Sequence, residues 1–182
     1  MSETKEAVRL FKEVGLLKRM QRSGWIYLGF EHGDTVAAHS HRTSIIAYYL
    51  AKKLNANVEK VLLMSIFHDV PEARSWDLNK VAQRYDTIDE EKILREQLSA
   101  FPEIQEYYRE YSEKKTLEAK VTHDADLLEC IAQAKFYMEN HKMAEEWVVN
   151  AGNRLNLDLS KELMKEIDRS PEKWWEGLKK LD

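Results

Sequence analysis

Residues that interrupt helices are unusually scarce in this chain. It contains 6 glycines and 3 prolines among 182 residues, which is about 3% and 2%, whereas globular proteins average about 7% and 5%. Sandwiches and barrels need such residues at many tight turns. The shortage therefore excludes most β architectures and predicts an all-α fold.

Length and charge limit the number of domains and the kinds of partner that this chain can have. At about 150 residues per domain, the chain predicts a single domain over residues 1–182. The net charge of −4 argues against a nucleic-acid binder, which usually has a basic face. No apolar run reaches the ~20 residues that span a membrane, and the first residues lack a signal-peptide core. Because Cys130 is the single cysteine, we expect a reducing, cytoplasmic location.

Apolar periodicity outlines the helices. Residues 22–30 form an aromatic connector with two glycines. Thr87 and Glu90 form a capping box that predicts a helix start at residue 87, and Ser170-Pro171 predicts another start near the C-terminus. Helices are expected at about 3–20, 36–54, 57–67, 77–84, 87–100, 103–112 and 116–140, with two or three more after residue 140.

A possible metal site follows from the placement of polar residues on apolar helices. Residues 57–67 are apolar nearly all round and end in His68-Asp69, and a buried carboxylate must be paired or bind a metal. His39 lies on the apolar face of its helix, and Asp124 and Asp126 follow later. Two imidazoles and two carboxylates suit a divalent Mn, Co, Fe, Ni or Zn ion. The alternatives are a core histidine at His39 and a turn-capping role for Asp69.

Several motifs resemble those of the HD-domain metallophosphohydrolases. His39 precedes His68-Asp69 by 29 residues, and Asp126 follows Asp69 by 57. The surrounding segments resemble the small 5′-deoxynucleotidases of this superfamily and cover about residues 16–140, leaving 144–182 as a C-terminal addition. These segments are Arg22-Ser23-Gly24-Trp25, Val36-Ala37-Ala38-His39-Ser40, His68-Asp69-Val70-Pro71-Glu72 followed by Asp77, and Ala125-Asp126 followed by Glu129.

The resemblance implies a fold, a reaction and a ligand set. The fold would be an HD-domain bundle of five core helices with additional C-terminal helices. The reaction would be hydrolysis of deoxyribonucleoside 5′-monophosphates by metal-activated water, in a homodimer with a small nucleotide as substrate. The implied metal ligands are His39, His68, Asp69 and Asp126. Helical periodicity alone favours Asp124 over Asp126; if the motif is right, Asp124 bonds a neighbouring helix or His123.

The remaining candidate residues have roles suggested by their chemistry. Arg22 offers a planar fork that matches phosphate oxygens, and Trp25 could pack against the sugar or base. Glu72 lies one helical turn after His68-Asp69 and is a candidate general acid or base. Asp77 could orient the attacking water or bind a sugar hydroxyl. Their alternatives are a surface arginine, plain core packing for Trp25, and two solvated carboxylates.

Departures from the family pattern leave the substrate open. The family usually has an acid where this chain has Ala38, and the segment Leu78-Asn79 also differs. The rival functions are an HD phosphohydrolase acting on a cyclic nucleotide, a tetraphosphate or a triphosphate, and an interaction module with a structural metal. In the C-terminal addition, Trp147, Trp174 and Trp175 are expected either at a dimer interface or packed on their own domain.

Overall fold

The computed structural model describes residues 2–175 and 178, and these residues are helical without any β-strand. The prediction of an all-α fold is therefore confirmed. The elements are α1 (Glu3–Leu17), η1 (Ser23–Leu28), α2 (Val36–Leu54), α3 (Val58–Phe67), α4 (Glu72–Ser75), η2 (Ala82–Arg84), α5 (Glu90–Gln97), α6 (Pro102–Glu113), α7 (Leu117–Met138), η3 (Lys142–Ala144), α8 (Glu145–Gly152) and α9 (Asp158–Arg169).

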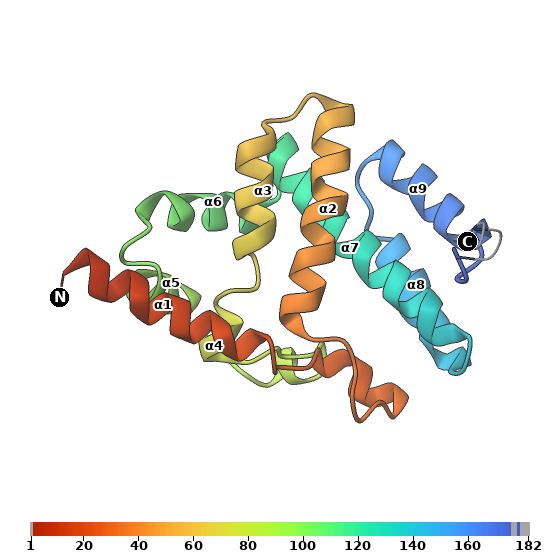
Figure 1. Cartoon of the computed structure of the whole chain (residues 1–182), viewed down its shortest axis with the longest axis horizontal. Coiled ribbons are helices and arrows are strands. Elements are labelled where there is room, and N and C mark those ends of the chain that lie inside the picture. Colours follow the sequence, from red (N-terminus) through yellow and green to blue (C-terminus); the bar gives the residue numbers. More distant parts are fainter. Residues whose placement is uncertain (1, 176–177, 179–182) are drawn as a thin grey trace.

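Helix α7 is the centre of the molecule. It packs against α2, α3, α6, α8 and α9, which surround it in Figure 1. Val121, Leu128 and Ile131 are buried along it, together with polar side chains such as Thr122 and Glu129. Because α7 is covered on more than one side, a polar stripe along it points into the protein instead of into solvent.

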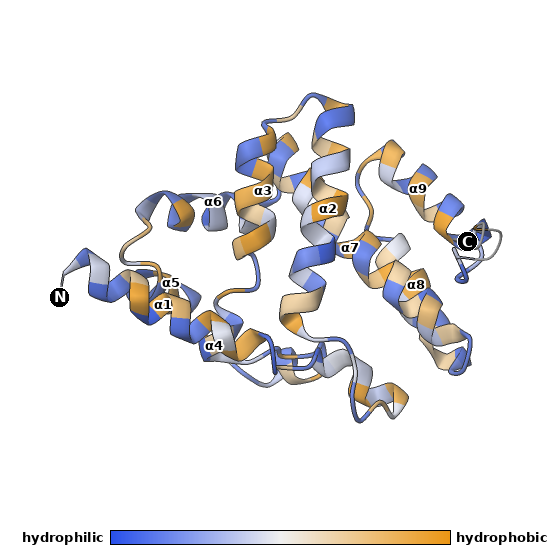
Figure 2. Cartoon of the chain, in the orientation of Figure 1, coloured by the Kyte–Doolittle hydropathy of each residue, from blue (hydrophilic) through white to orange (hydrophobic). Residues whose placement is uncertain are grey.

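Helices α2 and α3 begin and run as the sequence pattern predicts. Thr35 caps α2 by accepting a hydrogen bond from the backbone N–H of Ala38 at 3.2 Å, and Asn57 caps α3 in the same way. The apolar face of α2 buries His39 and Leu50. Helix α3 is among the most apolar segments in Figure 2, and it ends directly before His68.

Two clusters of apolar side chains flank this centre. The larger one joins α2, α3, α7 and the C-terminal α8 and α9. The smaller one joins α1 to α5 through residues such as Leu10 and Leu94, at the left of Figure 1. The segment that carries His68 and Asp69 runs between these two groups of helices, so both clusters position it.

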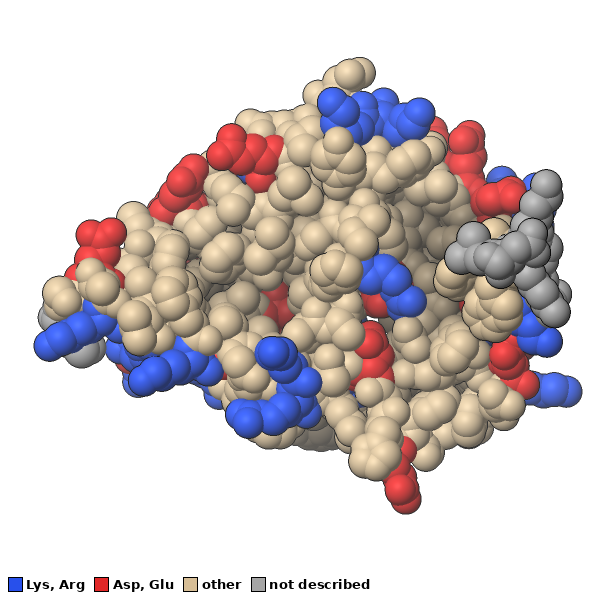
Figure 3. Space-filling model, in the orientation of Figure 1, with Lys and Arg blue, Asp and Glu red and all other residues tan. Residues whose placement is uncertain are grey.

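The surface has charges of both signs. Figure 3 shows Lys and Arg separated by acidic and uncharged surface on the visible face, with one basic group near the end of α2, whose last turn contains Lys52 and Lys53. None of the helices described here has the length and apolar character that crossing a membrane requires.

Some predicted helix boundaries were wrong. The Thr87–Glu90 capping box does not form, because α5 begins at Glu90 and Asp89 caps it by accepting from the N–H of Lys92 at 2.9 Å. The helix expected at 77–84 is only the short 3₁₀ turn η2. Asn79 explains this difference. Its side-chain oxygen accepts hydrogen bonds from the backbone N–H groups of residues 81 and 82 and fixes a turn there.

The C-terminal tryptophans divide into two groups. Ser170-Pro171 opens no helix among the described residues up to 175, where the chain forms bends and turns; most of the segment beyond lies outside the described residues. Trp174 and Trp175 are exposed. Trp147 instead packs against Trp25, with ring centroids 5.9 Å apart, so it belongs to its own domain's packing, which was the alternative expected for it.

Asp124 joins α7 to the start of α9. A bond to a neighbouring helix was one of the two roles expected for Asp124 if Asp126 is the metal ligand. Its carboxylate accepts hydrogen bonds from the backbone N–H and side chain of Asn156, at 2.9 Å each, and from the N–H of Leu157 at 2.8 Å. The side chain is fully buried. It therefore satisfies backbone donors that would otherwise be unpaired at the N-terminus of α9.

Replacing Asp124 by alanine is expected to destabilise the protein. Each hydrogen bond to a charged group contributes about 1.5–3 kcal/mol and the buried donors would lose their acceptor, so the free energy of unfolding should fall by about 2–4 kcal/mol. Urea denaturation at neutral pH measures this, with Asp158→Ala, at an exposed position in the first turn of α9, as the control. A loss no larger than the control's would contradict this role.

Candidate metal centre and pocket

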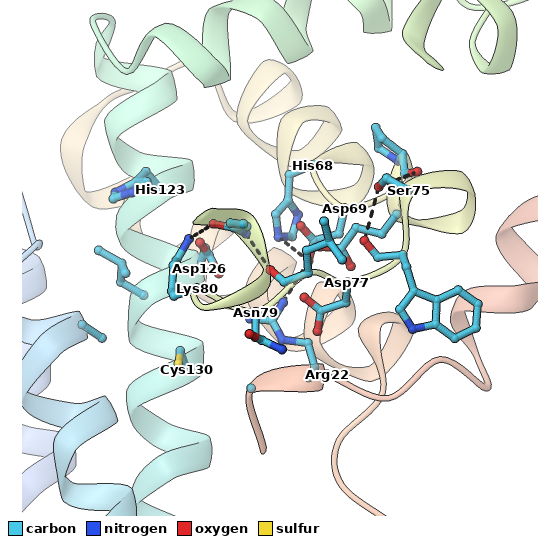
Figure 4. Close-up of a pocket in the computed structure, with 18 of the residues that line it drawn as sticks. Arg22, His68, Asp69, Ser75, Asp77, Asn79, Lys80, His123, Asp126 and Cys130 are labelled. Atoms are coloured by element: carbon cyan, nitrogen blue, oxygen red, sulfur yellow. Dashed lines mark hydrogen bonds and ion pairs between the residues drawn. The ribbon is translucent and has the colours of Figure 1, made fainter. Parts of the chain in front are cut away.

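A pocket of about 980 Å³ lies against α7, between η1, the segment around α4 and the end of α6 (Figure 4). It is lined by most of the residues that the sequence singled out. These are Arg22, Trp25, His68, Asp69, Glu72, Asp77 and Asp126. His39 is fully buried beside it. Segments far apart in the chain therefore meet at one place.

The two histidines and two aspartates form a compact cluster. The Nε2 atoms of His39 and His68 are 3.3 Å apart. Asp69 Oδ2 lies 3.2 Å from Nε2 of His68 and 3.5 Å from Nε2 of His39. Asp126 Oδ1 lies 3.2 Å from Nε2 of His39. Donor atoms of His39, His68 and Asp69 all fall within 4.8 Å of one another, which is close enough for one ion to reach them.

The hydrogen bonds of the two imidazoles show that this donor set fits a cation. His68 Nδ1 donates to the backbone carbonyl of Ser65 at 2.8 Å, and His39 Nδ1 contacts the carboxylate of Glu129. In a neutral imidazole whose Nδ1 donates, Nε2 carries a lone pair. Two lone pairs and two carboxylates then face one point, an arrangement that repels itself unless a cation lies between them.

The electrostatics of the cluster agree with this. Burial and the charge of Arg22 oppose protonation of His39, but its hydrogen bonds to Asp126 and Glu129 outweigh them and raise its pKa to about 9. Burial also opposes ionisation of Asp69, yet His68 and Arg22 lower its pKa to about 2. The pKa of Asp126 is lowered by His39 against the same burial effect. The cluster thus favours positive charge at its centre.

Glu129 and Arg42 support His39 from behind, a role that was not expected of either residue from the sequence. Glu129 is buried, and its other oxygen accepts from Nε of Arg42 at 2.9 Å. Arg42 also donates to Gln133 at 2.7 Å. A signal was present, since Glu129 lies one turn after Asp126 on α7 and Arg42 one turn after His39 on α2. This chain has alanine at residue 38, where an acid next to His39 was expected from the family pattern. The carboxylate that contacts His39 is instead supplied by Glu129 of α7.

Replacing Glu129 by glutamine is expected to weaken metal binding about 10–100-fold, because a carboxylate that accepts from a ligating histidine fixes its tautomer and raises its basicity. Competition with a chromogenic chelator measures the affinity. Gln133→Ala is the control, since Gln133 touches Arg42 and not His39. Unchanged affinity in Glu129→Gln would show that this contact is only structural.

Arg22 and Asp77 lie at the pocket edge. Arg22 Nη1 donates to Asp69 Oδ2 at 3.0 Å, and burial lowers its pKa less than Asp69 and Asp126 raise it. Asp77 Oδ2 accepts from the backbone N–H of Ser23 at 2.6 Å, which ties the segment after α4 to η1. Burial raises the pKa of Asp77 in spite of the Arg22 charge. A fixed guanidinium and a carboxyl group thus flank the metal cluster.

Glu72 is a carboxylic acid of the pocket with a strongly raised pKa. Its Oε2 is buried without a hydrogen-bond partner among the described residues. Burial, followed by the charges of Asp69 and Asp77, raises its pKa to about 10. A carboxyl group that keeps its proton near neutral pH can donate that proton.

Trp25 and Trp76, two of the tryptophans that line the pocket, differ in how far they are exposed. Trp25 lines the pocket, but it is only 3% exposed and packs edge-on against Tyr137, with centroids 5.1 Å apart. Trp76 is 57% exposed, and its φ of +69° is strained for a residue with a Cβ. This backbone conformation turns the chain between Glu72 and Asp77, and no sequence signal pointed to it.

Tyr111 is a further pocket residue that the sequence did not reveal. Its ring lies edge-on to His68, with centroids 5.8 Å apart. Burial and the charges of Asp126 and Asp69 raise its pKa. Its position near the end of α6, inside a strongly charged stretch of sequence, gave no sign that it faces inward.

Comparisons with known proteins agree with this geometry. A family model described as HD domain matches residues 14–167. The chain is 28% identical over 149 residues to the 5′-deoxynucleotidase HDDC2 of Xenopus laevis, covering 78% of this chain and 74% of that protein. It is 27% identical over 180 residues to the 5′-deoxynucleotidase hdd1 of Schizosaccharomyces pombe, covering 90% and 89%.

Solved structures show the same fold. A conserved hypothetical protein from Pyrococcus furiosus superposes with a TM-score of 0.78 at 34% identity, covering 90% of this chain and 99% of that one. A protein from Pyrococcus horikoshii OT3 gives 0.74 at 29% identity, covering 89% and 98%. Because the family model matches residues 14–167, which are most of its length, this chain belongs to the HD-domain family.

Proposed function

We propose that this chain is a metal-dependent phosphohydrolase that releases phosphate from deoxyribonucleoside 5′-monophosphates. The observation that carries the proposal is the cluster of His39, His68, Asp69 and Asp126 beside Arg22 and the buried, unpartnered carboxyl oxygen of Glu72. The named activity of the curated relatives supports the same substrate class.

The proposed metal ligands are His39, His68, Asp69 and Asp126. This mixture of imidazole and carboxylate suits Mn, Co, Fe, Ni or Zn. Such an ion, when bound, lowers the pKa of a coordinated water so that hydroxide is available near neutral pH. Glu129 holds His39 with its Nε2 lone pair toward the ion.

The other pocket residues bind the substrate and handle protons. Arg22 would hold the phosphate oxygens with its remaining N–H groups while Asp69 anchors it. Glu72 would give its proton to the sugar oxygen that leaves, and would therefore act as the general acid. Asp77 would position the attacking water or a sugar hydroxyl. Trp25 and Trp76 would confine the sugar, with the exposed Trp76 ring more able to touch it.

A single domain, a cytoplasmic location and a homodimer remain part of the proposal. The exposed pair Trp174 and Trp175, with ring centroids 5.8 Å apart, is a candidate dimer contact because aromatic residues are enriched in interface cores. Sedimentation of the wild type and of a Trp174→Ala, Trp175→Ala double variant tests this.

The test of the function is phosphate release from a panel of nucleotides. Metal-stripped protein is assayed with and without Mn or Co on deoxy- and ribonucleoside 5′-monophosphates, 3′-monophosphates, a cyclic dinucleotide and a deoxynucleoside triphosphate. Metal-dependent release from deoxynucleoside 5′-monophosphates alone is the expected result. Preferred turnover of the cyclic or triphosphate substrate would replace the substrate assignment and keep the metal chemistry.

The rival from another class is an interaction module with a structural metal. The buried, unpartnered oxygen of Glu72 beside the cluster argues against it, because a structural metal needs no proton donor at its edge. Bound metal without turnover of any nucleotide in the panel would favour the module.

A further inference from the structure

A second group of charged side chains enters the same pocket beyond the metal cluster. Lys80, Lys114 and Arg154 all line it, and we call them the distal cations. They come from three separate elements: the loop before η2, the residue that ends α6, and the turn after α8. Their convergence is therefore a product of the tertiary structure.

The distal cations have no carboxylate partner among the described residues. Lys80 donates to the side-chain oxygen of Gln83 at 2.9 Å, and Arg154 Nη2 lies 3.4 Å from Nε2 of His123. Burial and the charges of Arg154 and Lys80 lower the pKa of Lys114. The three cations thus repel one another. Many arginines are instead paired with acids, namely Arg9, Arg22, Arg42, Arg74, Arg95 and Arg109.

The position of this group relative to the metal cluster is set by α7. His123 precedes Asp126 by three residues, which is about 4.5 Å along a helix. In Figure 4, His123 and Asp126 lie on α7 and Lys80 reaches into the space in front of them. The charge of Asp126 also acts on Lys114. Arg154, beside His123, therefore lies about one helical turn along α7 from Asp126.

The pocket has room for an anion larger than a monophosphate. Its volume of about 980 Å³ is at the upper end of the ~300–1,000 Å³ usual for small-molecule sites. Outside the metal cluster, Glu90 and Glu146 also line it, but neither forms an ion pair with a distal cation, so the cations stay available. Lysine and arginine are the side chains that most often bind phosphoryl groups.

We propose that the distal cations bind a second phosphoryl group, so that a nucleotide with two phosphoryl groups binds in the pocket more tightly than the monophosphate substrate. The inference rests on the proposed function, since the first phosphoryl group is the one held at the metal cluster and Arg22. The second group is either the β-phosphoryl of a 5′-diphosphate or the phosphoryl at O3′ of a 3′,5′-bisphosphate. A single arginine at Arg22 would not by itself give such a preference.

Calorimetry tests this on metal-loaded protein that carries Glu72→Gln, a change that slows hydrolysis of the monophosphate during the titration. The probes are deoxyadenosine 5′-monophosphate, 5′-diphosphate and 3′,5′-bisphosphate, and the comparison between the last two identifies the source of the second group. We expect one of them to bind at least tenfold more tightly than the monophosphate. Lys114→Ala and Arg154→Ala should each remove most of this preference and change monophosphate affinity less than twofold, and Lys114→Arg should keep it.

The matched control is Lys115→Ala. Lys115 neighbours Lys114, but it pairs with Glu113 at 3.0 Å and lies outside the pocket lining. Equal affinity for all three probes would overturn the inference, as would equal weakening of monophosphate and bisphosphate in the Lys114 and Arg154 variants. The proposed function fails separately: no phosphate release from any nucleotide, with the charge-dependent preference intact, would discard the reaction and keep the binding site.

Discussion

Asp126→Asn is expected to lose its bound metal and to release phosphate about 10³-fold more slowly than the wild type. A bound ion supplies several kcal/mol of transition-state stabilisation, and each 1.36 kcal/mol is a factor of ten in rate. Asp126 is the carboxylate of α7 that reaches the cluster, with Oδ1 3.2 Å from Nε2 of His39. Asparagine keeps the shape of the side chain and removes its charge, so the effect reports on ligation.

Asp124→Asn is the matched control, because it makes the same change two residues away on the same helix. Asp124 is bonded to Asn156 and Leu157 and does not belong to the cluster. Its variant should be less stable yet keep one metal per folded chain and most of the activity. Metal quantification on both proteins, after a folded fraction has been isolated, decides the matter. The reverse pattern would assign the ligand to Asp124 instead.

Glu72→Gln is expected to lower kcat by about 10²–10⁴-fold, which is the usual contribution of a positioned acid, while the metal content stays that of the wild type. Its Oε2 is buried without a partner, and burial with the charges of Asp69 and Asp77 raises its pKa to about 10. Glutamine has the same size but cannot release a proton to the departing sugar oxygen.

The choice of leaving group makes this prediction sharper. A nitrophenyl phosphate has a leaving group that needs no proton, so Glu72→Gln should lose far less activity on it than on a deoxynucleotide. Glu90→Gln, at another acid of the pocket lining, should leave both activities near the wild-type level. Equal losses on both substrates would show that Glu72 acts on the water or the metal cluster and not on the leaving group.

Asp124 and Asp126 show where the sequence pattern and the structure disagree. Helical periodicity places Asp124 on the apolar side of α7 and so favours it as the inward residue. The structure buries both sides of α7, one against the α8–α9 connection and the other against α2 and α3. Both aspartates therefore face inward, and periodicity cannot tell them apart; only the motif favoured Asp126, which lies beside His39.

Residues without a motif could not be found from the sequence. Tyr111, Lys114 and Arg154 reach the pocket because of how α6 and α8 pack on α7. In the sequence they are one aromatic residue and two basic residues, which lie inside or just after charged or amphipathic helices. The positive φ of Trp76 likewise has no signal in the sequence.

By itself the sequence determined the all-α class and the main helices, and it predicted the histidines and aspartates that the structure gathers into one cluster. Few helix breakers and regular apolar spacing act locally, and the motif spacing is visible along the chain. The tertiary structure alone decided which face of α7 meets the histidines, that Glu129 and Arg42 stand behind His39, and that three cations share the pocket. Those features depend on contacts between segments more than 30 residues apart, and no local pattern encodes the packing that brings such segments together.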